Sequence, residues 1–242
     1  MAGLPPGNTL RRNPRFRLIR ATRLDLSDPV ASLSEERLVA LMSVLGPQLE
    51  HLDLSGNTLL ADRFFRRGLH PNMRTLTSLA LNNLPLPTDT GVATVFETWA
   101  AEHVNKDLVS LSLSRVPLLG DETLGAVLAH CGGSVTHLNI NGWKGATQKT
   151  LSTIGDAARE LRRLDVGWHR EMDDFIMAKI MNGCNKLEEV KCFGCNRLTQ
   201  NCPRTVSPSS LFAPPRSWLT HFQTPTFQRN VSLFGVESHM VA

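Results

Sequence analysis

The chain has 242 residues, a length that suits one repeat solenoid or one to two compact domains. Its 41% hydrophobic and 20% charged residues are the balance of a soluble globular protein, and no apolar run approaches the roughly 20 residues of a membrane span. The first residues lack the apolar core of a secretory signal, so the five cysteines indicate free thiols in a reducing compartment rather than a disulfide framework.

The net charge of +4 is concentrated in the first 23 residues, which contain six arginines and no acidic residue. Subtracting these six charges leaves −2 on the rest of the chain. Clustered guanidinium groups attract polyanions without a defined fold, so residues 1–20 are predicted to form a disordered basic arm. The arm either contacts nucleic-acid phosphates or serves nuclear import, or it is a solubilising leader. The candidates for weak nucleic-acid contact are Arg11, Arg12, Arg15 and Arg17.

A leucine-rich motif, L-x-x-L-x-L, recurs along the chain. Its six clear copies are centred on Leu52, Leu79, Leu111, Leu138, Leu164 and Val190, and a weaker first copy is centred on Leu24. The seven centres follow one another at intervals of 28, 27, 32, 27, 26 and 26 residues. In each copy the apolar side chains of a short strand point into the stack and the other positions face out. The sequence therefore predicts an α/β fold, a leucine-rich-repeat solenoid (horseshoe) of about seven strand–helix units over residues 21–204, with its strands on the concave side.

The segments between the strands have the apolar spacing of helices. Ser32 to Glu35 resembles a capping box ahead of a first helix that runs to Leu45. Further helices are predicted over residues 88–99, 121–128, 147–158 and 173–181. The extra residues of the 32-residue interval either lengthen the helix and its following loop or form a bulge that binds a partner.

Four cysteines could in principle bind zinc through thiolates: Cys184, Cys192, Cys195 and Cys202. The repeat register favours another interpretation. Cys192 takes the last apolar position of its strand, and Cys195 takes the position three residues later, where Asn57 stands in the second repeat. Asn or Cys at that position bonds to the backbone of a neighbouring loop. We therefore expect structural cysteines, and neither a metal ion nor a cofactor.

The outward strand positions present short polar and charged side chains on the concave face. The candidate partner-binding residues are His51, Asp53, Asn82, Asn139, Asn141, Arg163, Asp165 and Lys191. No nucleophile, base and acid have triad-like spacing, and no phosphate-binding loop is present. We therefore expect a binding protein without catalytic residues. Trp143 and Trp168 follow their strands at nearly equivalent points and either pack beneath the loops or offer aromatic contacts to a partner.

The C-terminal part departs from the repeat pattern. Residues 205–228 contain four prolines, one arginine and no acidic residue, and neither the strand nor the helix period continues through them. We expect a disordered, Pro-rich insert there. Residues 229–242 again have the pattern of a strand, which would cap the stack.

Several strings carry a resemblance to known families. Residues 184–199 resemble the cysteine-containing type of leucine-rich repeat, which is common in F-box substrate receptors of ubiquitin ligases. The strings at residues 51–57, 138–144, 161–175, 187–204 and 235–241 are more particular, among them DVGWHRE and GVESH. Together they resemble the fungal leucine-rich-repeat proteins of global-genome nucleotide excision repair, the radiation-sensitivity family. The resemblance covers about residues 21–204 and 229–242, and only about 20 residues precede the repeats, fewer than in the family.

The resemblance implies a nuclear protein that recognises ultraviolet-damaged DNA together with a Swi/Snf-type ATPase. It also implies a place in a cullin-type ubiquitin ligase, with an elongin-type adaptor as a further partner. On this basis we expect a scaffold that meets damaged DNA through its complex. The alternative is an F-box-like substrate receptor of a ubiquitin ligase without a role in DNA damage.

Overall fold

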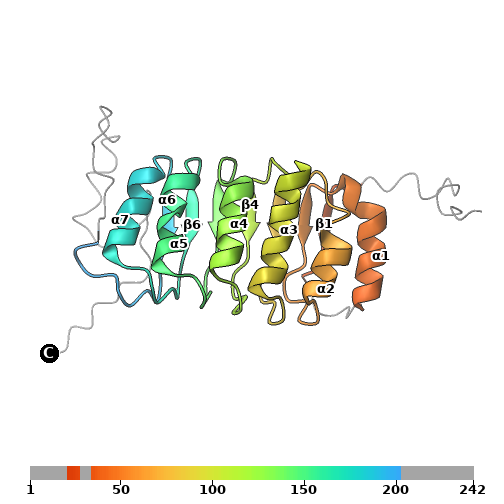
Figure 1. The fold of residues 1–242 in the computed structure, drawn as a ribbon, viewed down its shortest axis with the longest axis horizontal. Helices are drawn as coiled ribbons and strands as arrows, with labels where there is room; N and C mark the ends of the chain where they lie inside the picture. Colours follow the sequence, from red (N-terminus) through yellow and green to blue (C-terminus); the bar gives the residue numbers. More distant parts are fainter. Residues whose placement is uncertain (1–20, 28–33, 203–242) are drawn as a thin grey trace, which may run out of the picture.

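The computed structural model describes residues 21–27 and 34–202. In this part of the chain seven parallel strands form one open sheet, and a row of helices covers one of its faces (Figure 1). The predicted arm (residues 1–20, with Arg11, Arg12, Arg15 and Arg17), the Pro-rich insert (205–228) and the capping strand (229–242) lie outside the described residues.

The strands pair in the order in which they occur in the sequence. They are β1 (Arg23–Asp25), β2 (His51–Asp53), β3 (Ser78–Ala80), β4 (Ser110–Ser112), β5 (His137–Asn139), β6 (Arg163–Asp165) and β7 (Glu189–Lys191). The central residues face one another directly along the whole sheet, from Leu24 of β1 to Val190 of β7. These are the seven predicted strand centres, so the repeat register is confirmed.

Helices connect the strands on the other layer. They are α1 (Glu35–Leu45) with a 3-10 turn (Gly46–Gln48), α2 (Asp62–Phe64) with a π-helical turn (Phe65–Leu69), α3 (Asp89–Glu102), α4 (Asp121–Cys131), α5 (Gln148–Ser152), α6 (Ile154–Ala157) and α7 (Asp174–Gly183). The predicted helices at 88–99, 121–128 and 173–181 correspond to α3, α4 and α7. The longest described helix, α3, fills the 32-residue interval, so the extra residues lengthen the helix and its loop.

Three helical details bear on the sequence-based expectation. The predicted helix 147–158 is divided at Thr153, whose hydroxyl donates to the Thr150 carbonyl and competes with helical hydrogen bonding. No helix bounds were predicted for the second repeat, where α2 and the π-helical turn bring the consecutive residues Phe64 and Phe65 into the core. The predicted capping box begins at Ser32, outside the described residues, and α1 begins at Glu35 itself, with Ser34 as its N-cap.

The curvature follows from the two different layers. Parallel strands stack about 4.8 Å apart, whereas packed helices need about 8–10 Å. A unit with one strand and one helical segment is therefore wedge-shaped, and a stack of such units bends with its strands inside. This supports the predicted assignment of the concave face to the sheet and of the convex face to the helices. The fold is a leucine-rich-repeat solenoid.

The core is continuous along the stack because every repeat supplies the same three apolar positions. In the six clear copies all of these side chains are at most 2% exposed, from Leu49 to Cys192. Helix residues such as Met42, Phe96 and Ile180 close the core from the convex side. No unit could bury its apolar residues alone, so each repeat depends on its neighbours.

An aspartate at the first position of several helices joins each repeat to the next. Asp62 of α2 accepts hydrogen bonds from the backbone N–H and the hydroxyl of Thr88, the N-cap of α3 (2.8 and 2.7 Å). Asp121 binds Thr147 ahead of α5 in the same way. Asp89 instead accepts from three N–H groups at the start of α4, including those of Gly120 and Thr123. The carboxylates thus satisfy donors that the next helix leaves unpaired.

A second link between repeats lies three residues after the last apolar strand position. Asn57 Nδ2 donates to the Leu26 carbonyl (2.9 Å) and Trp143 Nε1 to that of Leu113 (2.7 Å). In the next two repeats His169 Nε2 lies 2.8 Å from the Ile140 oxygen, and Cys195 Sγ lies 3.1 Å from the Val166 oxygen. Four different side chains therefore make the same contact with the preceding repeat.

This link bears on the interpretation of the cysteines. Cys195 makes the predicted loop contact, and Cys192 is a buried core residue, as the register indicated. Burial raises the pKa of Cys192 to about 12 and that of Cys195 to about 11, so both thiols are protonated at neutral pH. Cys192 and Cys195 thus take the structural positions that the repeat register indicated.

Substitution of Asp89 by alanine tests the carboxylate link. Three N–H donors at the start of α4 would lose their acceptor, so we expect the free energy of unfolding to fall by about 1–2 kcal/mol. The exposed Asp107, in the loop after α3, is the matched control, and Asp107→Ala should change stability by less than about 0.5 kcal/mol. Urea unfolding curves measure both. Equal effects of the two substitutions would contradict the role of Asp89.

The buried His169 should make stability depend on pH. Burial lowers its pKa below the ordinary value of 6.5, so the unfolded chain binds a proton that the folded chain resists. Stability must then fall as the pH drops below about 6.5. His169→Asn keeps the carbonyl contact, as Asn57 does, but cannot be protonated. We expect the melting temperature of the variant to fall less than that of the wild type between about pH 7.5 and pH 5.5. Equal losses in the two proteins would refute this.

Candidate partner-binding surface on the concave face

Two columns of outward-facing side chains cross the strands of the concave face. The first column consists of Arg23, His51, Ser78, Ser110, His137, Arg163 and Glu189, and the second of Asp25, Asp53, Ala80, Ser112, Asn139, Asp165 and Lys191. Each column exists because the strands are in register and because alternate residues of a strand point to the same side. The seven short strands therefore place side chains from distant parts of the sequence about 5 Å apart.

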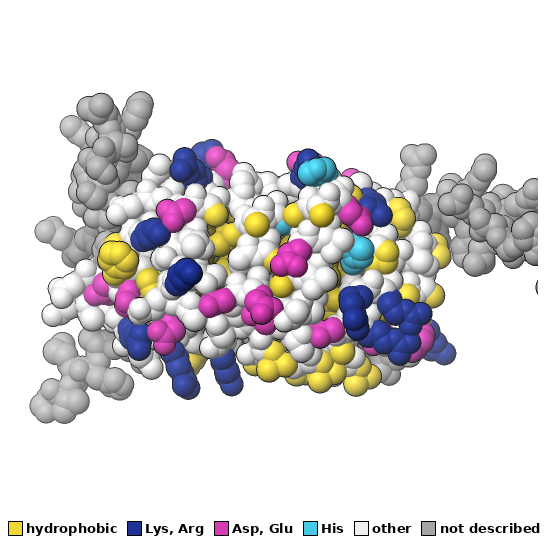
Figure 2. Space-filling view, viewed as in Figure 1, with side chains coloured by type: hydrophobic (Ala, Val, Ile, Leu, Met, Phe, Trp, Pro, Cys, Tyr) yellow, Lys and Arg dark blue, Asp and Glu magenta, His cyan; other side chains and the backbone are white. Residues whose placement is uncertain are grey.

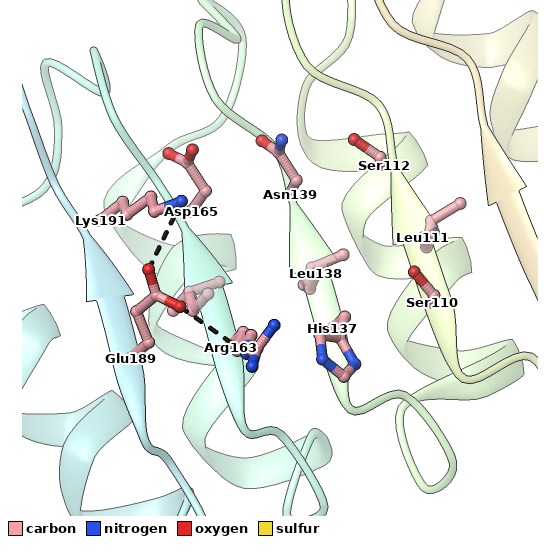
Figure 3. A pocket seen from close by; sticks show the side chains of 11 residues that line it. Ser110, Leu111, Ser112, His137, Leu138, Asn139, Arg163, Asp165, Glu189 and Lys191 are labelled. Atoms are coloured by element: carbon pink, nitrogen blue, oxygen red, sulfur yellow. Dashed lines mark ion pairs between the residues drawn. The ribbon is translucent and has the colours of Figure 1, made fainter. Parts of the chain in front are cut away.

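A hollow of about 260 Å³ lies over β4 to β7 (Figure 3). It brings together four of the predicted partner-binding residues: Asn139, Arg163, Asp165 and Lys191. His51 and Asp53 lie two strands beyond it on β2, and Asn82 and Asn141 lie just past the ends of β3 and β5. The predicted residues thus share one face, but only half of them line one hollow.

The charged side chains of the hollow form a row across β6 and β7. Glu189 lies between Arg163 (Nε to Oε2, 3.7 Å) and Lys191 (Nζ to Oε1, 3.4 Å), as Figure 3 shows. The cationic side chains are half or more exposed, at 60% and 50%. Ion pairs this exposed contribute little to stability. A partner could therefore replace them with its own charges at small cost.

His137 of β5 lies beside Arg163 in the first column. The Thr136 hydroxyl lies 2.7 Å from its Nδ1 atom. Partial burial lowers the pKa of His137, and the nearby Arg163 lowers it further. The imidazole is therefore neutral at neutral pH, and its Nε2 atom can either donate or accept a hydrogen bond.

Several of the predicted binding residues have a structural task. Asp53, Asn139 and Asp165 each accept a hydrogen bond from the backbone N–H two residues later (2.8, 3.1 and 3.0 Å). Such contacts end the strand in a tight turn. Asn141 donates to Asp165 (3.0 Å), and Asn82 accepts from Ser112 and Ser114 of the next repeat. The side chains freer to meet a partner are consequently Arg163, Lys191 and His137.

Four polar residues of the hollow were missing from the sequence-based candidates: Ser110, Ser112, His137 and Glu189. Glu189 stands in the same column as His51 and Arg163, so the repeat register could have identified it. The serines carried no signal beyond that register, since small polar residues are common at exposed strand positions. The hollow presents mixed charge and hydrogen-bonding groups, which suits recognition of a polar protein surface.

The tryptophans differ from each other. Trp143 is buried (2% exposed) and holds the Leu113 carbonyl, so it packs beneath the loops. Trp168 stands one position earlier in its repeat and is 57% exposed.

Among the described helices, none is both long and apolar enough to cross a membrane.

Comparison with known proteins finds a curated relative and a solved structure that resemble this chain. The chain is 31% identical over 176 residues, 72% of its length, to the DNA repair protein rhp7 of Schizosaccharomyces pombe. It spans 31% of the length of that relative. The crystal structure of the Rad7 and Elc1 complex in yeast contains a chain of similar fold, with a TM-score of 0.64 at 24% identity. That match covers 76% of this chain and 44% of the other.

No family model matches the sequence. The match to rhp7 nevertheless covers most of the chain, and the solved Rad7 chain shares the solenoid. Over 72% of its length the chain is therefore similar to the DNA repair protein rhp7, and it shares the leucine-rich-repeat solenoid of the solved Rad7 chain.

Proposed function

We propose that the chain is a non-catalytic scaffold of global-genome nucleotide excision repair that acts in the nucleus. It would recognise ultraviolet-damaged DNA together with a Swi/Snf-type ATPase and would work within a cullin-type ubiquitin ligase. The observation that carries this proposal is the 31% identity to a DNA repair protein over 176 residues of the chain. Since the chain spans only part of that relative, function has to be tested on this chain itself.

The concave face supports a role in binding. Its hollow combines exposed cations, carboxylates and a neutral imidazole without a buried, isolated charge. The hydroxyl bonded to His137 belongs to Thr136 beside it in the sequence, whereas the Asp165 carboxylate is held by the Gly167 backbone and by Asn141. These groups are arranged for structure and recognition rather than for activation of a nucleophile.

An elongin-type adaptor is the second proposed partner. The solved Rad7 chain of similar fold is in a complex with Elc1. We extend that partnership to this chain as part of the same proposal, and the cullin would be reached through the adaptor. The test is co-purification of the full chain with an elongin-type adaptor.

One observation favours a different function. Residues 184–199 form a cysteine-type repeat, and Cys195 makes its loop contact as such repeats require. This repeat type is common in F-box substrate receptors, so a ubiquitin-ligase receptor without a role in DNA damage is the second candidate. Restoration of ultraviolet survival, in cells that lack their own rhp7-like protein, separates the two. Restored survival supports the repair scaffold, and unchanged sensitivity supports the receptor.

Charge reversal in the hollow should weaken the partnership with the ATPase. Arg163→Glu/Lys191→Glu replaces the two exposed cations beside Glu189 by carboxylates, so the row becomes wholly negative. We expect binding to the ATPase to fall about tenfold or more. Quantitative pull-down at low and moderate salt measures the change. The control, Lys106→Glu/Lys149→Glu, makes the same change in charge outside the concave strands and should bind normally. Wild-type binding by the concave variant would exclude this hollow as the contact.

A further inference from the structure

The loops that follow the strands form one edge of the stack, the lower edge in Figure 1, and they share one backbone conformation. The second residue after the last apolar position of a strand has a positive φ in each described repeat from β2 to β7. These residues are Gly56, Asn83, Arg115, Gly142, Trp168 and Gly194. The N–H of this residue donates to a carbonyl of the next loop, for example from Trp168 to Phe193 (2.7 Å). The position therefore favours glycine or asparagine.

Trp168 is an outlier at this position. Its φ is 62°, a conformation that a bulky side chain adopts only at a cost, and 57% of the residue is exposed. Its ring lies over Gly194, where an added Cβ would be 2.6 Å from the Trp168 ring. Because the ring is exposed, burial in the core does not offset the cost of this conformation. A contact with a binding partner would explain why a tryptophan stands at this position.

Phe193 completes an aromatic platform with Trp168. The two rings meet edge to face, with centroids 5.2 Å apart and planes at 71°. Phe193 is 47% exposed and takes a position where the other repeats have Ser55, Asn82 or Ser114. Both rings are therefore exposed at an edge where their counterparts are small or polar. The loop hydrogen bonds hold them in place.

Three cations stand on the neighbouring loops. Arg115, Lys144 and Arg170 are exposed, and among the described residues none of them has a carboxylate within 4.0 Å. The acidic Glu171 beside them is paired with Arg197 (2.8 Å). Figure 2 shows Lys and Arg side chains that project from this edge below α5. The platform thus lies among positive charges without close partners.

We propose that this platform and these cations bind single-stranded or locally unpaired DNA. Bases would stack on Trp168 and Phe193, and phosphates would meet Arg115, Lys144 and Arg170. Aromatic side chains accept any base by its π-face, and cations follow the backbone, so such binding is largely independent of sequence. The inference deepens the proposed repair function, because it names unpaired DNA as the ligand.

Comparison of the two halves of this edge favours nucleic acid over protein as the ligand of the Trp168 half. Figure 2 shows apolar side chains gathered below α2 and α3, where the loops expose Leu59, Leu86 and Leu118. That half offers the flat apolar contact typical of protein interfaces. The Trp168 half instead combines aromatic rings with unpaired cations. Its chemistry is complementary to a polyanion with exposed rings.

The test uses the full chain and fluorescence anisotropy with an oligothymidylate of about 20 nucleotides, longer than the roughly 4–16 that single-strand-binding folds cover. A duplex of equal length is the comparison. Trp168→Gly/Phe193→Ser installs residues that the other repeats carry at these positions, so its melting temperature should not fall. Loss of stacking should weaken single-strand binding by roughly 5- to 100-fold and duplex binding far less.

The cations are tested by salt dependence. Arg115→Asn/Lys144→Ala/Arg170→Ala should reduce the slope of log K against log salt for the single strand by about 2, since each phosphate contact contributes about 0.7. The control, Arg37→Ala/Arg66→Ala/Arg67→Ala, removes three exposed arginines from α1 and the π-helical turn and should leave that slope unchanged. For the Trp168/Phe193 variant, Leu59→Ser is the matched control, because it removes another exposed apolar side chain from the same edge.

Three results would overturn the inference: wild-type affinity of the Trp168/Phe193 variant for the single strand, equal losses for single strand and duplex, or loss of a protein partner with intact DNA binding. The outcome is separable from that of the proposed function. A chain that fails to restore ultraviolet survival, but loses single-strand binding in the variant, refutes the repair role and supports the DNA site. A chain that restores survival, but whose Trp168/Phe193 variant binds single-stranded DNA as the wild type does, supports the repair role and refutes the DNA site.

Discussion

The in-register pairing of seven three-residue strands is the constraint on which the rest of the structure depends. A strand this short has too few hydrogen bonds and too little apolar area to be stable alone. It persists because its central residue lies directly against the central residues of both neighbours. A slip by one residue would turn the buried positions of a repeat toward solvent, so the apolar motif fixes the register.

Once the register is fixed, each position in the repeat has one structural environment. The position three residues after the strand shows this most clearly, because Asn, Trp, His and Cys all use it to reach the preceding repeat. Side chains of very different chemistry are therefore equivalent in the stack. The converse also holds: Trp143 and Trp168 differ by one register position, and one is buried while the other is exposed.

The same principle sets how much could be predicted from the sequence. Strand centres, the concave columns and the structural role of Cys195 follow from the period, so they were predicted. The division of the helix at Thr153 and the π-helical turn at Phe65 depend on local hydrogen bonds and packing that leave no periodic signal. The hydrogen bonds that occupy Asp53, Asn139 and Asp165 are likewise local, which is why these residues were taken for partner contacts alone.

A stack of this kind separates its surfaces by position within the repeat. Outward strand residues build the concave face, and the loops that follow the strands build an edge beside it, so neither surface needs residues of the other. The concave hollow is polar and charge-balanced around Glu189, whereas the edge carries Trp168 and three cations that have no carboxylate within 4.0 Å among the described residues. Because each repeat contacts only its neighbours, both surfaces are built from the same four repeats, β4 to β7, and neither depends on contacts with distant repeats. Under the functions proposed here, the concave face would meet a protein and the edge a DNA strand within the same four repeats, as a scaffold between the two requires.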